Sequence, residues 1–288
     1  MLAIYKRELR SYFCSMTGYI FIAAVMIFTG IYFMVNNLVS GYPYFAYTLV
    51  NSLLIYIIVV PILTMRSLAE ERHSKTDQLL LTSPASVTSI VLGKYLAMMT
   101  VFAIPLAVFC ICPLIISTAG SAYLFGDYMS IFCVLAIGAL FVSIGMFISS
   151  TTENQIISAV VTLVALLLLY MWDSLILLLP TSAIGNLVAS FVLLAVLVLC
   201  VWLFSKNRIV TLAVAAVGII GLVAAYCLEP TLFEGLVANL LAAFSVNTVL
   251  YNFCHYYVFD LGGIFMLLSV AAMFVFLTVQ TIQKRRWS

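Results

Sequence analysis

Apolar runs long enough to cross a lipid bilayer occupy most of this sequence. A membrane-spanning helix needs about 20 apolar residues to cross about 30 Å of hydrocarbon. Hydrophobic residues make up 66% of the chain and charged residues only 8%. The runs of sufficient length are 18–39, 47–66, 95–118, 129–149, 156–179, 185–205, 209–227 and 261–282. The sequence therefore predicts an all-α fold, a single polytopic domain over 1–288 with about eight transmembrane helices.

The positive charges are segregated to one side of these spans. Cytosolic loops of membrane proteins are enriched in Lys and Arg. With a cytosolic N-terminus, all 12 basic residues fall on the cytosolic side and the opposite side carries only acidic residues. The basic residues are Lys6, Arg7, Arg10, Arg66, Arg72, Lys75, Lys94, Lys206, Arg208, Lys284, Arg285 and Arg286; the acidic ones are Asp127, Glu229, Glu234 and Asp260, with Asp173 near that interface. We therefore expect an even number of spans and two cytosolic termini.

One sizeable hydrophilic segment, 67–93, interrupts the apolar runs and is expected in the cytosol. Its first half, Leu68 to Leu80, is typical of a helix, with Glu71 and Lys75 spaced i, i+4, as are His73 and Asp77. Ser83 can cap a second helix with Pro84 at its first position. The pattern predicts a helix, a break and a second helix leading into the third span, a semi-rigid lever. The alternative is an ordinary solvated loop.

Three further segments have a distinct character. Residues 2–14 place Leu2, Tyr5, Leu9, Tyr12 and Phe13 on one helical stripe, which favours an interfacial helix over an extension of the first span. The segment 185–227 reads as a hairpin of two spans joined by a short basic turn. In 228–260 a helical apolar stripe is followed by Asn247, Asn252 and His255. This outer segment fits re-entrant or interfacial helices better than another crossing.

The chain lacks the motifs of an enzyme or an ion-coupled transporter. The Gly93–Lys94 pair has no upstream glycine and no following Ser or Thr, so the sequence contains no phosphate-binding loop. No intramembrane carboxylate pair or relay of ionisable residues is visible. We expect no catalytic residue, cofactor or metal in this chain, because His255 beside Cys254 matches no known ligand spacing. Its energy source is then another protein.

Several motifs resemble one family of transport proteins. They are E-E-R-x-x-x-T-x-x-L-L-L-T-S-P from Glu70 to Pro84, G-K-Y from Gly93 to Tyr95, and the C-terminal D-L-G-G-I and K-R-R-W. Together with the N-terminal helix, they resemble the type-2 ABC transporter permeases, in particular the subgroup named for gliding motility and nitrous-oxide-reductase maturation. The resemblance covers 1–179 and about 231–288. The family usually has six spans, so 185–227 would be an inserted hairpin.

The resemblance implies a membrane permease subunit that exports a substrate across the cytoplasmic membrane of a prokaryote. ATP and Mg²⁺ would bind a separate ATP-binding subunit, which docks on the hydrophilic segment. The implied partners also include a second permease, either identical or a paralogue, and an auxiliary extracytoplasmic subunit, but no nucleic acid. The residues expected to couple to the ATPase are Glu70, Glu71, Arg72, Thr76, Leu79, Leu80 and Pro84. The alternatives are a non-transporting scaffold coupled to a cytosolic ATPase and an intramembrane enzyme acting on lipid.

Overall fold

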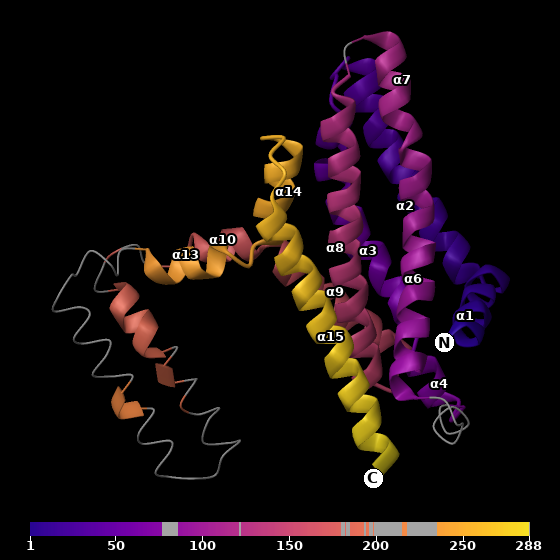
Figure 1. Ribbon diagram of the computed structural model, residues 1–288, viewed down its shortest axis with the longest axis vertical. Coiled ribbons are helices and arrows are strands. Elements are labelled where there is room, and N and C mark those ends of the chain that lie inside the picture. Colours follow the sequence, from indigo (N-terminus) through magenta and orange to yellow (C-terminus); the bar gives the residue numbers. More distant parts are fainter. Residues whose placement is uncertain are drawn as a thin grey trace. The chain divides into compact units, whose positions relative to one another are not determined.

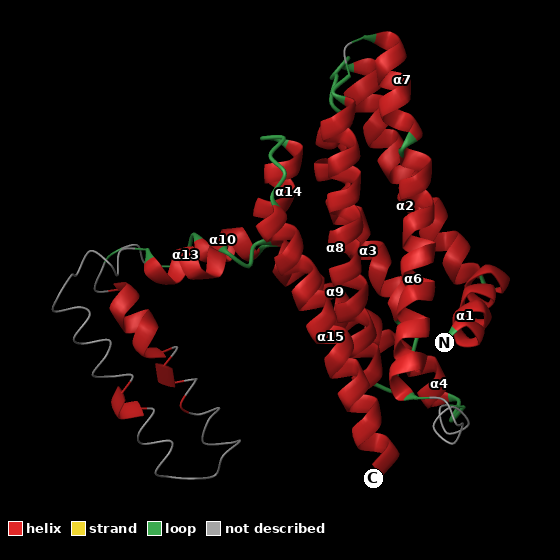
Figure 2. Cartoon of the chain, in the orientation of Figure 1, coloured by secondary structure: helices red, strands yellow, loops and turns green. Residues whose placement is uncertain are grey.

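The computed structural model describes residues 1–76, 86–120, 122–179 and 235–287, together with residues 182, 185–192, 194–195, 198 and 215–217. Over these residues every regular element is a helix, and there is no strand (Figure 2). The chain falls into two compact units, one formed by Met1–Tyr170 with Val246–Ser288 and the other by Met171–Ser245. The predicted all-α class is confirmed.

The first unit holds most of the described helices. They are α1 (Leu2–Cys14), α2 (Met16–Phe33), the π-helix η1 (Met34–Val39), α3 (Phe45–Thr64), α4 (Ala69–His73), α6 (Val87–Phe109), α7 (Ile111–Ala119), α8 (Leu124–Thr151), α9 (Gln155–Tyr170), α14 (Val246–Cys254) and α15 (Leu261–Trp287). The described helices of the second unit include α10 (Trp172–Ile176) and α13 (Leu236–Ala242), where the Trp172 Nε1 donates to the Leu241 carbonyl at 2.9 Å.

Five of the described helical segments are long and apolar enough to cross a membrane: Met16–Val39, Phe45–His73, Val87–Thr118, Leu124–Thr151 and Leu261–Arg285. They coincide with five of the predicted spans, and counting α13 with α14 as one broken span would give six. The predicted span 156–179 is divided, because α9 ends at Tyr170 and α10 begins at Trp172. At 16 residues α9 is about 24 Å long, short of the roughly 30 Å core. The predicted hairpin 185–227 lies largely outside the described residues.

The core of the first unit is built around α8. This helix packs against α15, α3, α6, α14 and α9, and most of its surface is buried, whereas α2 and α15 leave most of theirs exposed (Figure 1). Glycines allow the close approach. A Cβ on Gly138 would lie 2.1 Å from the Phe102 ring of α6, and a Cβ on Gly145 would lie 2.3 Å from the Thr64 Oγ1 of α3. Small residues at such contacts are typical of membrane helix packing.

A buried acid fixes the start of α3. Asp127, near the N-terminal end of α8, is fully buried, and its Oδ1 accepts a hydrogen bond from the Ala46 N–H at 3.0 Å. Tyr44, at the N-cap position of α3, provides no side-chain cap. The carboxylate therefore takes over the capping role from a neighbouring helix, where it also complements the helix dipole. The sequence placed Asp127 on the outer side but did not predict its burial.

The described part of the segment 228–260 is helical, with a break between α13 and α14 that precedes Asn247 instead of falling at Asn247 and Asn252. In the second unit α13 begins after Gly235, whose φ of +68° lies in the left-handed region that favours glycine. In the first unit, Asp260 connects α14 to α15, because its Oδ2 accepts from the Asn252 Nδ2 at 3.0 Å and its Oδ1 accepts from the Gly263 N–H at 2.9 Å. Asp260 thus caps α15 and holds the preceding turn.

The contact at Gly138 gives a testable consequence. Phe102 is buried between the rings of Phe21 and Tyr56, so it has little freedom to move away from a new methyl group. We expect Gly138→Ala to destabilise the protein by about 1–3 kcal/mol and to lower its melting temperature in detergent. Gly30→Ala in α2 is the matched control, because nothing lies within 4 Å of its Cβ. Equal melting temperatures for the two variants would contradict the packing argument.

Candidate functional site

The hydrophilic segment forms a shorter helix than the sequence predicts. Instead of a helix from Leu68 to Leu80, α4 spans only Ala69–His73, and the chain turns at Lys75, whose φ is +57°. A left-handed residue ends a helix, which is the physical reason for the early stop. The predicted pair of Glu71 with Lys75 is therefore wrong, because Glu71 turns inward to other partners. Asp77, the predicted partner of His73, lies outside the described residues.

The helix that follows also starts later than predicted. The described helix α6 begins at Val87 and is capped by Ser86, whose Oγ accepts from the Ser89 N–H at 3.3 Å. Ser86 has an extended backbone, so the helix that enters the third span is not the one predicted to start at Ser83 and Pro84. Both of those residues lie outside the described part of the chain.

The start of α4 is held by a side chain of α8. Leu68 occupies the N-cap position but provides no side-chain cap. The Ser149 Oγ instead accepts hydrogen bonds from the N–H groups of Leu68 and Ala69, at 3.2 and 3.0 Å, and donates to the Met65 carbonyl at 3.3 Å. One buried hydroxyl therefore satisfies the free N–H groups at this helix start. The position of α4 is set by α8 as well as by the chain that leads into it.

A second contact joins α4 to the C-terminal end of α8, next to Ser149. The Arg72 guanidinium donates to the Ser150 carbonyl at 3.1 Å and to the Glu153 carboxylate at 3.0 Å. A cation at the last carbonyls of a helix is favourable because the helix dipole is negative there. Arg72 is thus engaged within the chain, on the side of α4 that faces the turn between α8 and α9.

Four charged residues from three helices form a closed ring beside α4. The Lys94 Nζ of α6 lies 2.8 Å from the Glu71 Oε1 and 3.3 Å from the Glu8 Oε1 of α1. The Arg7 Nη2 lies 3.3 Å from the same Glu71 oxygen and 2.5 Å from the Glu8 Oε1. Opposite charges therefore alternate around the ring, and the hydrogen bond that Arg7 donates to the Glu8 carboxylate raises the pKa of Arg7. Lys94 also donates to the Ser67 carbonyl at 2.9 Å.

Helix α1 is anchored to the bundle by apolar and polar contacts. The predicted helix 2–14 is confirmed as α1, and Figure 1 shows it beside α6 at the same end as α4. The Tyr12 hydroxyl donates to the Leu63 carbonyl at 3.3 Å, and burial raises the pKa of Tyr12. Gly93 lets α1 come close, because a Cβ there would lie 3.1 Å from the Ile4 Cγ2.

An open polar cavity of about 360 Å³ lies between α1 and α4. Three cationic and three anionic side chains face it, together with three hydroxyl groups. The lining residues are Arg7, Glu8, Ser11, Arg66, Glu70, Glu71, Ser74, Thr76 and Lys94. Glu70 pairs with Arg66 through two bonds, at 2.6 and 2.7 Å, and both side chains remain partly exposed. The cavity offers charges of both signs to a protein surface.

The structure brings four of the seven predicted coupling residues together at this end of the bundle. Glu70, Glu71 and Arg72 lie in α4, and the Thr76 Oγ1 donates to the Glu71 carbonyl at 3.3 Å. The other three, Leu79, Leu80 and Pro84, lie outside the described residues. Sequence reasoning missed the roles of Lys94 and Glu8. A signal was available, because a lysine about two turns inside an apolar helix requires a nearby carboxylate.

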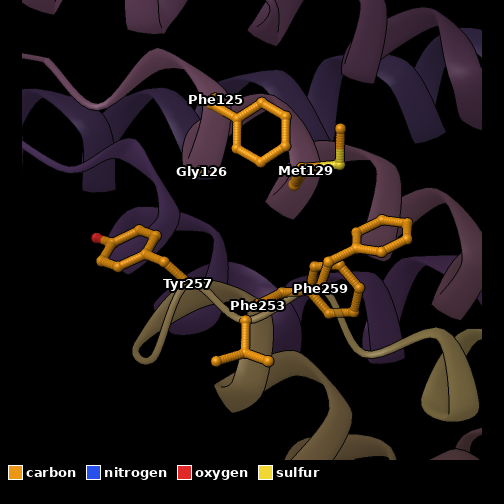
Figure 3. A pocket seen from close by; sticks show the side chains of 7 residues that line it. Phe125, Gly126, Met129, Phe253, Tyr257 and Phe259 are labelled. Atoms are coloured by element: carbon orange, nitrogen blue, oxygen red, sulfur yellow. The ribbon is translucent and has the colours of Figure 1, made fainter.

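At the opposite end of the first unit, aromatic residues from α8, α14 and the following turn surround a small pocket. Figure 3 shows Phe125 and Met129 facing Tyr257 and Phe259 across it. The Tyr257 ring centroid lies 5.3 Å from that of Tyr44 and 5.1 Å from that of Tyr123. The volume of about 10 Å³ is comparable to that of one water molecule. This pocket cannot hold a substrate.

These observations define a multi-pass helical membrane protein with a short charged helix fastened to the end of its spans. The family model described as ABC-2 family transporter protein matches residues 2–184, which is more than half of the chain. The chain therefore belongs to the ABC-2 transporter family and is a transmembrane permease component of an ABC transporter. Comparison with curated proteins and with solved structures gave no match.

The cap on α4 can be tested by removing the Ser149 hydroxyl. Ser149→Ala removes the acceptor of two backbone N–H groups, and losing such a cap costs about 1 kcal/mol. We expect faster amide hydrogen exchange at Leu68 and Ala69, by about fivefold for that free energy. Ser143→Ala is the matched control, since the buried Ser143 Oγ bonds only the Leu140 carbonyl of its own helix. Unchanged exchange in Ser149→Ala would show that α4 is held by other contacts.

Proposed function

We propose that this chain is the permease subunit of an ABC transporter that exports a substrate across the cytoplasmic membrane, driven by ATP hydrolysis on a separate subunit. The observation that carries the proposal is the attachment of α4. This helix follows α3, is tied to α8 by Ser149 and Arg72, and is tied to α6 by Lys94. A force applied to α4 therefore acts on three membrane-spanning helices at once.

Membership of the family supports an ATP-binding partner in general terms. That subunit would hold ATP and Mg²⁺ and would dock on the end of the bundle formed by α1 and α4, with Glu70 and Arg66 as the exposed ion pair within reach. Leu79, Leu80 and Pro84 would complete the contact. Lys94 and Asp127, two buried charged residues of the described spans, each lie near a helix end with partners of their own. Their engagement supports an external source of energy over an ion relay.

The remaining features of the proposal come from the sequence motifs. We propose, from the resemblance of the run from Glu70 to Pro84, that the chain belongs to the gliding-motility and nitrous-oxide-reductase-maturation subgroup. A second permease would complete the transport path, and an auxiliary subunit would act outside the membrane. A scaffold that transmits force without transport is less favoured, because the matching family is one of transporters.

The orientation of the chain is tested by single-cysteine labelling. Ser74→Cys lies in the proposed cytosolic segment and Asn239→Cys in α13 of the proposed outer segment; both positions are exposed. We expect an impermeant maleimide to label position 239 in intact cells and position 74 only after the membrane is opened, because the basic residues then obey the positive-inside rule. Labelling of position 74 in intact cells would overturn the proposed topology.

The docking face is tested by charge reversal at Glu70. Native chain purified in mild detergent should carry an ATP-binding subunit with it; its absence would contradict the proposal. Glu70→Arg places a cation beside Arg66 at the proposed interface, so we expect the dissociation constant of the two subunits to rise about tenfold, or about 1.4 kcal/mol.

Two further variants calibrate that measurement. Glu70→Gln should give a smaller loss, since an exposed ion pair contributes only about 0.2–1 kcal/mol. Glu234→Gln, in the proposed outer segment, should leave the dissociation constant unchanged. If Glu70→Arg binds the ATP-binding subunit as tightly as Glu234→Gln does, the α4 face is not the docking site.

A further inference from the structure

Lys94 differs from the other members of the charged ring in its burial and in the helix that carries it. Its side chain is 2% exposed, whereas that of Arg7 is 52% exposed. It is also the only member on the long helix α6, because Arg7 and Glu8 belong to α1 and Glu71 belongs to α4, the short helix that ends the segment Phe45–His73. The ring therefore connects the third span to two short helices through one buried ammonium group.

The ring depends more on Lys94 than on its other cation. Without the Lys94 ammonium, the Glu8 and Glu71 carboxylates would share only the half-exposed Arg7 guanidinium, and both are largely buried, with side-chain exposures of 12% and 19%. Like charges left unpaired in such a site repel each other, and their burial is costly. Water can replace the half-exposed Arg7 guanidinium more readily than the Lys94 ammonium, because the Lys94 side chain is only 2% exposed.

Lys94 also gives a direct physical connection from α4 to α6. Along the chain, α4 ends at His73 and α6 begins only at Val87, with a left-handed turn at Lys75 between them. Across space, the Lys94 Nζ touches α4 at the Glu71 carboxylate and the segment before α4 at the Ser67 carbonyl.

We propose that Lys94 is a positioning residue that joins α1 and α4 into one rigid lever on the end of α6. This inference rests on the proposed function, since the lever has a task only if a partner moves it. Displacement of α4 passes into the third span through the Lys94 ammonium, and α1 moves with α4 because Glu8 shares that ammonium. The Tyr5 hydroxyl, 3.0 Å from the Thr100 Oγ1, keeps α1 aligned along α6 during the movement.

The test measures distances within the assembled complex by pulsed electron resonance. Spin labels at Lys6 and His73 report the separation of α1 from α4, and labels at His73 and Thr88 report that of α4 from α6; all three positions are exposed. The native cysteines are replaced in the background used for labelling. In the otherwise unaltered chain, we expect both distances to have narrow distributions that are the same without nucleotide and with a non-hydrolysable ATP analogue.

Lys94→Met should broaden both distributions and make them depend on nucleotide while the ATP-binding subunit stays bound. Lys94→Arg should restore the native widths, because a guanidinium can reach both carboxylates. Arg10→Met is the control, since Arg10 is an exposed cation of α1 outside the ring. The combination Glu8→Gln, Glu71→Gln and Lys94→Met removes the unpaired charges, so it inserts and assembles normally even if Lys94→Met does not.

Each outcome decides the inference. If the neutral combination assembles and keeps the native narrow distributions, simple packing joins the helices and the proposal is wrong. It is equally wrong if the native distances themselves shift with nucleotide, because α1, α4 and α6 then move separately. Failure of the native chain to bind any ATP-binding subunit would instead contradict the proposed function. In that case the widths of the distance distributions, measured in the permease alone, would still decide whether Lys94 joins the helices.

Discussion

A lysine ammonium near the end of a membrane-spanning helix must be neutralised where it lies when its side chain is only 2% exposed, as that of Lys94 is. In this protein the requirement fixes the arrangement of one whole end of the bundle. Lys94 draws Glu71 inward from α4 and Glu8 inward from α1, and Arg7 closes the ring. Helix α4 is short and polar, whereas α1 also packs an apolar stripe against α6. Charge pairing thus positions α4 and adds to the apolar packing of α1.

At the opposite end of the first unit, a buried carboxylate takes the place of the buried lysine, and it too is paired with a neighbouring helix. Asp127 is buried on α8, and its carboxylate accepts from the backbone at the start of α3. Above it, Tyr257 packs between Tyr44 and Tyr123, and Gly126 leaves room for the Tyr257 ring. A buried charge at each end therefore fixes how neighbouring helices begin. Between the ends, the contacts are of the kind seen at Gly138 and Gly145, where shape alone decides the spacing.

The sequence predicted the features that follow from composition and periodicity. The span positions and the bounds of α1 depend on long apolar runs and on a helical stripe, so they could be read without knowing any neighbour. The length of α4 could not, because it depends on a left-handed turn at Lys75 and on a cap from Ser149, far away in sequence. For the same reason, the sequence spacing predicts a pair of Glu71 with Lys75. In the fold, Glu71 pairs instead with Lys94, a buried lysine on another helix. Local spacing suggests a weak exposed pair, but burial selects the strong one.

The three charged residues expected to contact a partner prove to have different tasks. They are consecutive in a helix only slightly longer than one turn, so their side chains point in different directions about its axis. Glu71 points to α6 and α1, and Arg72 points to the end of α8, so both are used to hold α4 in place. Glu70 is the most exposed of the three side chains, at 40% against 19% for Glu71 and 13% for Arg72, and it pairs with Arg66 beside the open cavity. A partner that docks on α4 would therefore recognise Glu70 and the cavity, while Glu71 and Arg72 would carry its movement into the spans. In the proposed complex, recognition and transmission would be separated on a single turn of helix, so that a substitution would disturb one while sparing the other.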